Sequence, residues 1–406
     1  MLSRRRFLIA GLVTGAGALL AACAAAIESV LPSATATPSA TPSPSPSATP
    51  APTPTPSPSP SPVGPSLREK IGQMLLVGFR GLTAGAADAT RQQIAAGQLG
   101  GILLFSVDQL TGGLRNVDSP EQLRGLVDAL AAASAGPPLA VAIDQEGGMV
   151  ARLGPAHGFP ATSSAATLGR GDPSATAAAA RAMAETLSSV GVTLNLAPVV
   201  DLAVNPDNPI IAAVERSFSA DPDVVIAHAT AFIQAHHDIG VHSAIKHFPG
   251  QGSATGDTHA GVVDVTDVWT DVELEPFAAL VGQGLPDAVL TAHIFNGRLD
   301  PDHPATLSKP TITGILRDQL GWDGAVISDD MQMGAIRDAY GYEEAVALAI
   351  EAGVDILLIA NQLVYEPDVA PRTVDIIEGL VRSGRITEER IDASYRRILA
   401  LKGAVR

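Results

Sequence analysis

Cysteine is nearly absent from this chain of 406 residues, since Cys23 is the only one. A single cysteine excludes an intramolecular disulfide and any zinc or redox site built from several thiolates. Positive charge is also scarce, with 26 lysine and arginine residues against 42 aspartate and glutamate residues, a formal net charge of −16. A field of this sign repels nucleic acid and anionic lipid, so we expect no nucleic-acid partner.

The few basic residues at the start of the chain belong to an export signal. Arg4-Arg5-Arg6 precede Phe7-Leu8 and an apolar run that ends at residue 22, which is typical of a secretory signal of the twin-arginine kind. Leu20-Ala21-Ala22-Cys23 resembles the lipobox of bacterial lipoproteins. We therefore expect residues 1–22 to be cleaved and Cys23 to be lipidated, so that the protein is exported and anchored to the outer face of the cell membrane. An uncleaved membrane anchor is the alternative.

A proline-rich linker is predicted for residues 23–65. Between residues 33 and 65 proline alternates with serine, threonine and alanine, and no residue is charged. This proline density blocks helix and sheet hydrogen bonding and favours extended polyproline geometry, which could span roughly 100 Å. The linker is expected to be disordered and to hold one domain, residues 66–406, away from the membrane.

Eight short apolar runs alternate with alanine-rich segments of helical period from Ser66 onward. Their hydrophobicity is continuous rather than alternating, which indicates strands buried on both faces of a parallel sheet. The sequence therefore predicts an α/β fold, a single (β/α)₈ TIM-type barrel. The main rival, a doubly wound open sheet, lacks its Gly-x-Gly-x-x-Gly fingerprint after the first strand. The expected strands span residues 74–79, 101–105, 140–144, 193–200, 243–248, 288–294, 325–329 and 355–360.

Polar residues stand at the carboxyl ends of these predicted strands, where barrel enzymes place their active sites. One such residue is more often a helix cap or a satisfied hydrogen-bond partner, but several together favour a site. They are Asp144-Gln145-Glu146, Asp201, Lys246-His247, His293, Ser328-Asp329-Asp330 and Asn361.

The segment after the predicted fifth strand combines glycines with titratable residues. Gly250, Gly252 and two further glycines free the backbone, so the segment is a candidate for a mobile lid. Asp257 precedes His259 by two residues, and an aspartate beside an imidazole fixes its tautomer and prepares it for proton transfer. The alternative is that Asp257 caps a turn and His259 is solvated.

These motifs, taken in order, resemble the glycoside hydrolase family 3 β-N-acetylglucosaminidases, and the resemblance extends from about Leu67 to the C-terminus. It implies a retaining exo-glycosidase that releases terminal N-acetylglucosamine from peptidoglycan fragments or chitooligosaccharides. The matching segments are residues 144–148, 195–201, 216–218, 246–250, 257–259 and 328–331.

The resemblance also implies residue roles. Asp329 would be the nucleophile, His259 the general acid/base and Asp257 its orienting partner, while Asp330, the second choice for nucleophile, would be structural. A small carbohydrate substrate is expected, without a cofactor, a metal or a required protein partner. The implied sugar-binding residues are Asp144, Arg216, Lys246 and His247.

Three positions depart from the family pattern. Met149 stands where arginine is frequent, Gln251 where histidine is frequent and Thr258 where serine is common. These changes bear on aglycone preference and lid motion rather than on the proposed catalytic residues.

Other functions stay open at this point. A β-glucosidase of the same family and a sugar-binding lipoprotein without catalysis are alternatives. A metal-dependent hydrolase would need several of five residues to converge on a cation, namely His242, His247, Asp257, His259 and His293.

Overall fold

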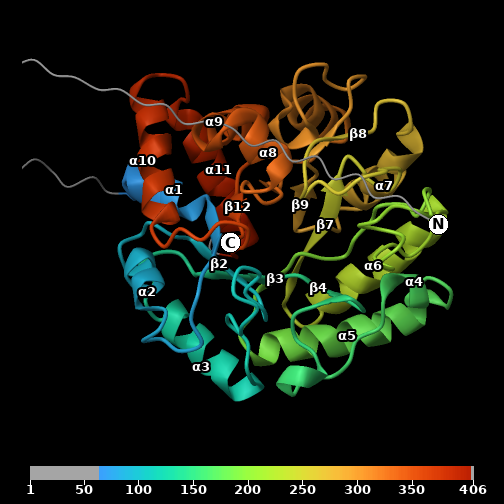
Figure 1. Cartoon of the computed structure of the whole chain (residues 1–406), viewed down its shortest axis with the longest axis horizontal. Coiled ribbons are helices and arrows are strands. Elements are labelled where there is room, and N and C mark those ends of the chain that lie inside the picture. Colours follow the sequence, from blue (N-terminus) through green and yellow to red (C-terminus); the bar gives the residue numbers. More distant parts are fainter. Residues whose placement is uncertain (1–63, 404–406) are drawn as a thin grey trace, which may run out of the picture. The chain divides into compact units, whose positions relative to one another are not determined.

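The computed structural model describes residues 64–403 (Figure 1). The predicted signal peptide, Cys23 and the linker up to residue 63 lie outside the described residues. Within residues 64–403, no helix is both long enough and apolar enough to span a membrane.

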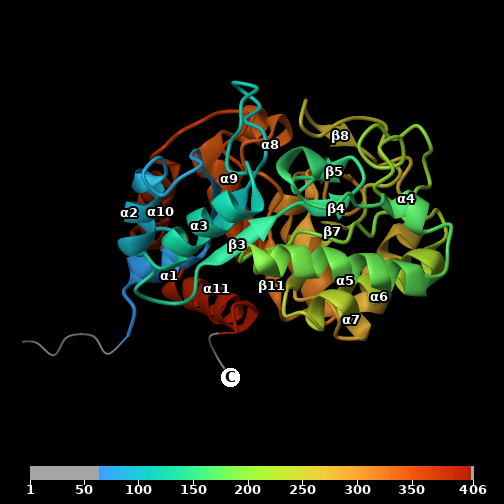
Figure 2. The same cartoon turned by 90° about the horizontal axis from the view of Figure 1, so that it is seen from below.

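Eight parallel strands form one sheet in the order β11-β9-β7-β6-β3-β2-β1-β12, with helices around the outside (Figures 1 and 2). A parallel bridge between Ile327 and Ile356 joins the two end strands and closes the sheet into a barrel. The predicted barrel is confirmed, and its strands keep the predicted chain order. They are β1 (Leu75–Gly78), β2 (Gly101–Leu104), β3 (Ala140–Ile143), β6 (Leu194–Asn195), β7 (His242–Phe248), β9 (Ala288–Thr291), β11 (Ala325–Ile327) and β12 (Leu357–Ile359).

Several of the helices begin at residues whose side chains cap them. Ser66 and Ser119 form capping boxes at α1 and α3, and Asp172 and Asp221 cap α5 and α6 directly before a proline. The helices are α1 (Leu67–Gln73), α2 (Asp88–Ala95), α3 (Pro120–Ala131), α4 (Ala165–Leu168), α5 (Pro173–Ser189), α6 (Pro222–His237), α7 (Glu275–Gly282), α8 (Gly334–Tyr340), α9 (Tyr342–Ala352), α10 (Val369–Arg382) and α11 (Glu388–Leu401). Short 3₁₀ turns η1 (Pro155–His157), η2 (Asp271–Leu274) and η3 (Ala305–Leu307) and a π-helix, η4 (Pro310–Gln319), complete the set.

The strands are buried on both faces, which accounts for their continuous apolar runs. All four residues of β1, β2 and β9 are buried, and the apolar core extends from them to the inner faces of the surrounding helices.

Seven of the eight strands are shorter than the sequence predicted, and β6 and β9 end the furthest before the predicted residue. β6 stops at Asn195 instead of residue 200, because Pro198 has no N–H to donate to a ladder. Val200 still donates its N–H to the carbonyl of Lys246, at 2.8 Å. β9 stops at Thr291, and the chain then leaves the barrel and forms β10 (Ile294–Phe295), which pairs with the loop strand β8 (Val263–Asp264). The loop after β7 is therefore fastened at its far end.

Candidate active site

A cavity of about 190 Å³ opens at the carboxyl ends of the barrel strands. Six of the seven residues predicted for the site line it, and the seventh, Asp257, is hydrogen-bonded to one of them. The six are Asp144, Arg216, Lys246, His247, His259 and Asp329.

Lys246 lies between two carboxylates deep in this cavity. It projects from β7, is 2% exposed, and places its Nζ 2.7 Å from Oδ1 of Asp144 and 2.8 Å from Oε1 of Glu146. Asp144 directly follows β3, and Glu146 lies in the hairpin of β4 (Gln145–Gly147) and β5 (Val150–Ala151). Burial alone would raise the pKa of both carboxyl groups, but the cations around them hold each pKa below its usual value.

Arg216 holds the other side of Glu146. Its Nε and Nη2 donate to the two carboxylate oxygens at 2.7 and 2.8 Å, and Nη1 donates to the carbonyl of Ile210 at 2.8 Å. Despite its burial, the pKa of Arg216 is raised because Glu146 stabilises the charge. The fork geometry fixes the guanidinium plane at the cavity wall.

His247 is held in one tautomer. Nη2 of Arg216 lies 3.2 Å from Nε2 of His247, and a guanidinium can only donate, so Nε2 accepts. Nδ1 therefore carries the proton and donates to Oδ2 of Asp201 at 2.6 Å. Asp201 is fully buried and fixes the ring orientation.

Asp329 lies in a turn between β11 and α8, and this turn is hydrogen-bonded to the neighbouring strand β12. Its own Oδ1 accepts the N–H of Asp330 at 2.8 Å, and Ser328 accepts the N–H of Leu358 through its hydroxyl at 2.9 Å. Burial opposes ionisation, but the three nearby histidines His293, His247 and His259 hold the pKa of Asp329 below its usual value. The carboxylate is therefore available as an anion.

Asp330 also lines the cavity, but one of its carboxylate oxygens is engaged by the backbone. Its Oδ1 accepts the N–H groups of Gln332 at 3.1 Å and Ala360 at 2.9 Å. Burial raises its pKa to about 6, against the lowering effect of these two N–H groups. This geometry favours the structural role expected for Asp330.

Asp257 and His259 form the expected pair on the loop after β7. Nδ1 of His259 lies 2.7 Å from Oδ1 of Asp257, which also accepts the backbone N–H of His259 at 2.9 Å. Asp257 thus closes the turn and orients the ring at once, combining the two readings of the sequence. The His259 side chain is 55% exposed and lines the cavity, so Nε2 can meet a ligand.

Two of the histidines that a metal site would need, His242 and His293, do not line the cavity. His293 is fully buried between the hydroxyl of Thr306 at 2.9 Å and the carbonyl of Asp330 at 2.9 Å, and burial lowers its pKa. His242 begins β7, at the opposite end of the barrel, where it contacts Asp287 at 3.1 Å. Among residues 64–403, no three His, Cys, Asp or Glu side chains are grouped so that they could hold a metal ion.

The sequence assigned no role to three residues of the site, Glu146, Asp201 and Arg152. Glu146 was visible as an acid two residues after Asp144, and Asp201 as a strand-end acid, but nothing in the sequence indicated their partners. Arg152 also lines the cavity, with Nη2 3.5 Å from Oδ2 of Asp144 and its guanidinium 5.3 Å from the ring centre of Phe105. It follows the β4–β5 hairpin, which the sequence did not predict.

The fold and the cavity together fit a barrel enzyme of the glycoside hydrolase class, with a carboxylate after the seventh strand and an Asp–His pair on a loop above it. Residues 66–401 match the model of the glycosyl hydrolase family 3 N-terminal domain. The chain therefore belongs to glycoside hydrolase family 3.

Curated and solved relatives agree with this assignment. The beta-hexosaminidase LpqI of Mycobacterium tuberculosis (strain ATCC 25618 / H37Rv) is 35% identical over 350 residues, which cover 83% of each chain. The solved beta-N-acetylhexosaminidase from Beutenbergia cavernae DSM 12333 superposes with a TM-score of 0.76 at 33% identity, over 84% of this chain and 99% of that one. The solved family 3 beta-N-acetylglucosaminidase from Paenibacillus sp. str. FPU-7 also gives a TM-score of 0.76, at 36% identity over 84% of this chain, which spans 62% of that longer chain.

Proposed function

We propose that this protein is a retaining exo-β-N-acetylglucosaminidase that releases terminal N-acetylglucosamine. The observation that carries the proposal is the meeting of Asp329 and His259 in one small cavity with the four expected sugar-binding side chains. A cavity of about 190 Å³, lined by charged and by apolar residues, suits one terminal sugar better than a long chain. The names of the relatives support the acetamido sugar.

In the first step Asp329 attacks the anomeric carbon and forms a glycosyl ester. As the glycosidic C–O bond breaks, the protonated ring of His259 gives the proton on Nε2 to the leaving oxygen. Asp257 holds Nδ1 at 2.7 Å, so the ring keeps its orientation while its charge changes. The lowered pKa of Asp329 supports its role as an anionic nucleophile.

In the second step the neutral ring of His259 takes a proton from water, and the hydroxide attacks the anomeric carbon from the face that the leaving group left. The C–O bond to Asp329 breaks and the carboxylate is restored. Two inversions at one carbon give net retention.

The sugar-binding groups are arranged before a substrate arrives. Lys246 is almost completely enclosed by Asp144 and Glu146, and Arg216 is fixed by Glu146. The Asp144 side chain is the more open carboxylate of the two, so it is the natural acceptor for sugar hydroxyl groups. Binding then requires little rearrangement of the protein.

The sequence supports a role in turnover of the cell wall. An exported lipoprotein anchored through Cys23 would meet peptidoglycan fragments, with chitooligosaccharides as the other candidate substrate. Labelling cells with a fatty-acid probe tests the anchor: the parent protein should acquire the label and Cys23→Ser should not. Equal labelling of both would reject lipidation at this residue.

The activity is tested by nitrophenol release from the β-N-acetylglucosaminide and from the β-glucoside, with Asp329→Asn as the inactive control. We expect a strong preference for the acetamido sugar. Preference for the glucoside would favour the β-glucosidase alternative, and no release from either, with intact fold and bound N-acetylglucosamine, would favour a sugar-binding protein.

A further inference from the structure

The loop that carries Asp257 and His259 leaves the barrel between two buried carboxylates. The N–H of Gln251 donates to Oδ1 of Asp201 at 2.9 Å, and the N–H of Ser253 donates to Oε2 of Glu273 at 3.2 Å. Asp201 lies in the loop after β6, whereas Glu273 lies in the η2 turn directly before α7, the helix labelled in Figure 1. The first residues of the loop are thus held from two sides.

Glu273 has an unusual environment for a glutamate. It is 1% exposed, no lysine or arginine within residues 64–403 pairs with it, and its Oε1 accepts no hydrogen bond in that part of the chain. The charged group that faces it is Asp201, whose oxygens are engaged by His247 and Gln251. Burial raises the pKa of Glu273 to about 7. A buried acid without a cation costs stability, which points to a function.

The loop backbone is shaped to fit closely around this carboxyl group. Gly250 has φ +107°, and a Cβ there would lie 2.7 Å from Cβ of Glu273. A Cβ at Gly252 would lie 1.8 Å from the carbonyl oxygen of Leu202. Neither position has room for a side chain, so these glycines serve close packing.

The far end of the loop is fixed as well. β8 pairs with β10, and Val265 and Trp269 pack in a small apolar cluster with Ile294. Between Ser253 and β8, the exposed residues are Thr255, His259, Ala260 and Val262. Asp257 is the fourth residue after Ser253, a span of at most about 14 Å, so we expect a shift at the first anchor to reach the Asp257–His259 pair.

We infer that Glu273 is a positioning residue: by accepting the N–H of Ser253 it holds the start of the loop so that His259 stands beside Asp329 in the cavity. The inference rests on the proposed roles of His259 and Asp329. Glu273 touches neither the cavity nor a reacting atom, so it acts through the loop alone.

The test compares Glu273→Ala with Glu275→Gln, an exposed control two residues away. Kinetics are measured on aryl β-N-acetylglucosaminides whose leaving groups range from dinitrophenol to a simple phenol. If proton donation by a misplaced His259 is lost, kcat/KM should fall roughly 10- to 100-fold for phenol but less than about 3-fold for dinitrophenol, which needs no acid. The control should match the parent. An equal fall for both leaving groups, or no fall, would overturn the inference.

Glu273→Gln provides a second test if the alanine variant does not fold. An amide resembles the protonated acid, which the parent carries below pH 7. The variant should therefore match the parent at pH 5.5. At pH 8 its kcat/KM for the phenyl substrate should be roughly 3- to 10-fold lower, because a neutral amide oxygen accepts the N–H of Ser253 more weakly than a carboxylate does. Hydrogen exchange of residues 249–262 should accelerate at pH 8 relative to the parent. Identical behaviour at both pH values, or an equal difference at both, would reject the positioning role.

The failure of this inference differs from failure of the proposed function. If the parent does not hydrolyse any N-acetylglucosaminide, or if Asp329→Asn is as fast as the parent, the proposed function is wrong. If the parent behaves as proposed and only the Glu273 variants lack dependence on the leaving group, the positioning role alone is wrong.

Discussion

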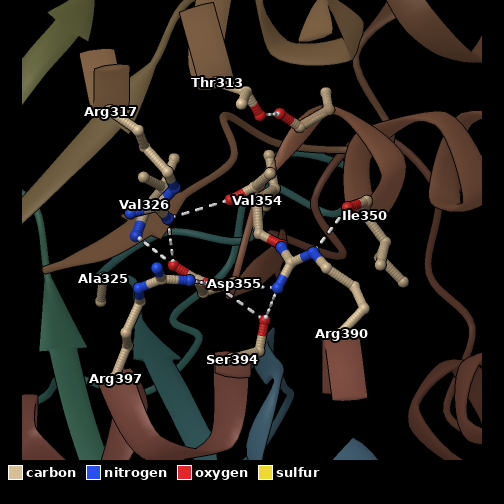
Figure 3. A network of polar contacts seen from close by, with 12 residues as sticks. Thr313, Arg317, Ala325, Val326, Ile350, Val354, Asp355, Arg390, Ser394 and Arg397 are labelled. Atoms are coloured by element: carbon tan, nitrogen blue, oxygen red, sulfur yellow. Dashed lines mark hydrogen bonds and ion pairs between the residues drawn. The ribbon is translucent and has the colours of Figure 1, made fainter. Parts of the chain in front are cut away.

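The two ends of this barrel each contain a cluster of buried charges, and the clusters differ in how completely their charges are paired. At the carboxyl ends of the strands, the half-buried Asp329 and the buried Glu273 have no lysine or arginine partner within residues 64–403. At the amino ends, Asp355 is surrounded by arginines (Figure 3). The incompletely paired end is the one that faces the cavity.

The cluster around Asp355 saturates a single carboxylate. Asp355 is 0% exposed and lies just before β12. Its Oδ2 accepts from Arg317 of η4 at 2.7 Å, and its Oδ1 accepts from Ser394 of α11 at 2.7 Å (Figure 3). Arg390 and Arg397 approach Oδ1 at 3.3 and 3.6 Å.

This cluster links β11 and β12, the two end strands of the sheet, where the barrel closes. Oδ2 of Asp355 also accepts the N–H of Val326 in β11 at 3.1 Å, so the carboxylate links the two strands whose pairing is the sparsest. Arg390 donates further to the carbonyls of Ile350 at 3.0 Å and Val354 at 2.6 Å. Strand, helix and carbonyl contacts are all satisfied, which is the arrangement of a stabilising network.

The comparison teaches that pairing separates two uses of buried charge. A saturated carboxylate stabilises the fold, whereas a carboxylate left without a cation lowers stability and keeps its reactivity. Substitutions at the two ends should therefore have opposite effects on activity and stability.

The largest effect is expected at Asp329. Asp329→Asn keeps the side-chain shape but removes the proposed nucleophile, so kcat should fall by roughly 10⁴-fold or more. Thermal unfolding should occur at the same or a higher temperature, because the variant no longer buries this anion. Kinetics and calorimetry on one preparation check both points. A lower melting temperature with partly retained activity would mean that Asp329 stabilises the fold, as Asp355 does, and is not the nucleophile.

His259 should show a smaller loss without any cost to the fold. His259→Ala removes an exposed side chain, so unfolding free energy should change by less than about 0.5 kcal/mol. Hydrolysis of a substrate with a poor leaving group should fall by roughly 10²- to 10⁴-fold. Asp257→Ala, measured in parallel, should lose less, because it only orients the ring; a larger loss than that of His259→Ala would reverse the assigned roles.

Asp355 should give the opposite result. Asp355→Ala leaves the cations Arg317 and Arg390 buried, and should lower the free energy of unfolding by about 3–5 kcal/mol. The turnover number per folded molecule should not change, since the cluster lies at the other end of the barrel. Denaturant titration gives the stability and active-site titration the folded fraction.

Asp323→Ala is the matched control. The Asp323 side chain is 91% exposed and pairs with Arg397, so this variant removes an exposed partner of the same arginine. Its cost should be about 1 kcal/mol or less. Equal costs for the two variants would show that burial is not what gives the Asp355 cluster its strength.

The fold could be predicted because its signal is local. Each strand is a continuous apolar run, and each strand-end acid or histidine follows such a run directly. Asp144, Lys246 and Asp329 could therefore be assigned to one face before any contact was known. The same logic failed for β6, where a single proline interrupts the ladder inside an apolar run.

Pairing between distant side chains could not be predicted. Asp355 was visible only as the first residue of a strand, yet its partners lie 35–39 residues away in α11 and 38 residues away in η4. Glu273 precedes a helix like many surface acids, and only the fold of the loop buries it. Burial and partner geometry depend on the tertiary arrangement, which residue spacing does not encode.

The smallest effect, and the clearest contrast between the ends, is the pH dependence of stability. The pKa of Glu273 rises from 4.5 to about 7 on folding, so between these values the unfolded chain binds fewer protons and stability falls as pH rises. Glu273→Gln removes this loss, and should match the parent near pH 4.5 and exceed its stability by roughly 1 to 3 kcal/mol at pH 8.

At the other end of the barrel, His237 and His242 help to lower the pKa of Asp287 from 3.8 to about 2, which adds stability above pH 3.8 that is lost as pH falls toward 2. Asp287→Asn should therefore be less stable than the parent at pH 7. Denaturant titrations of both variants and the parent at several pH values measure these differences. If Glu273→Gln and Asp287→Asn changed the free energy of unfolding in the same direction near neutral pH, the difference between the two ends would be rejected.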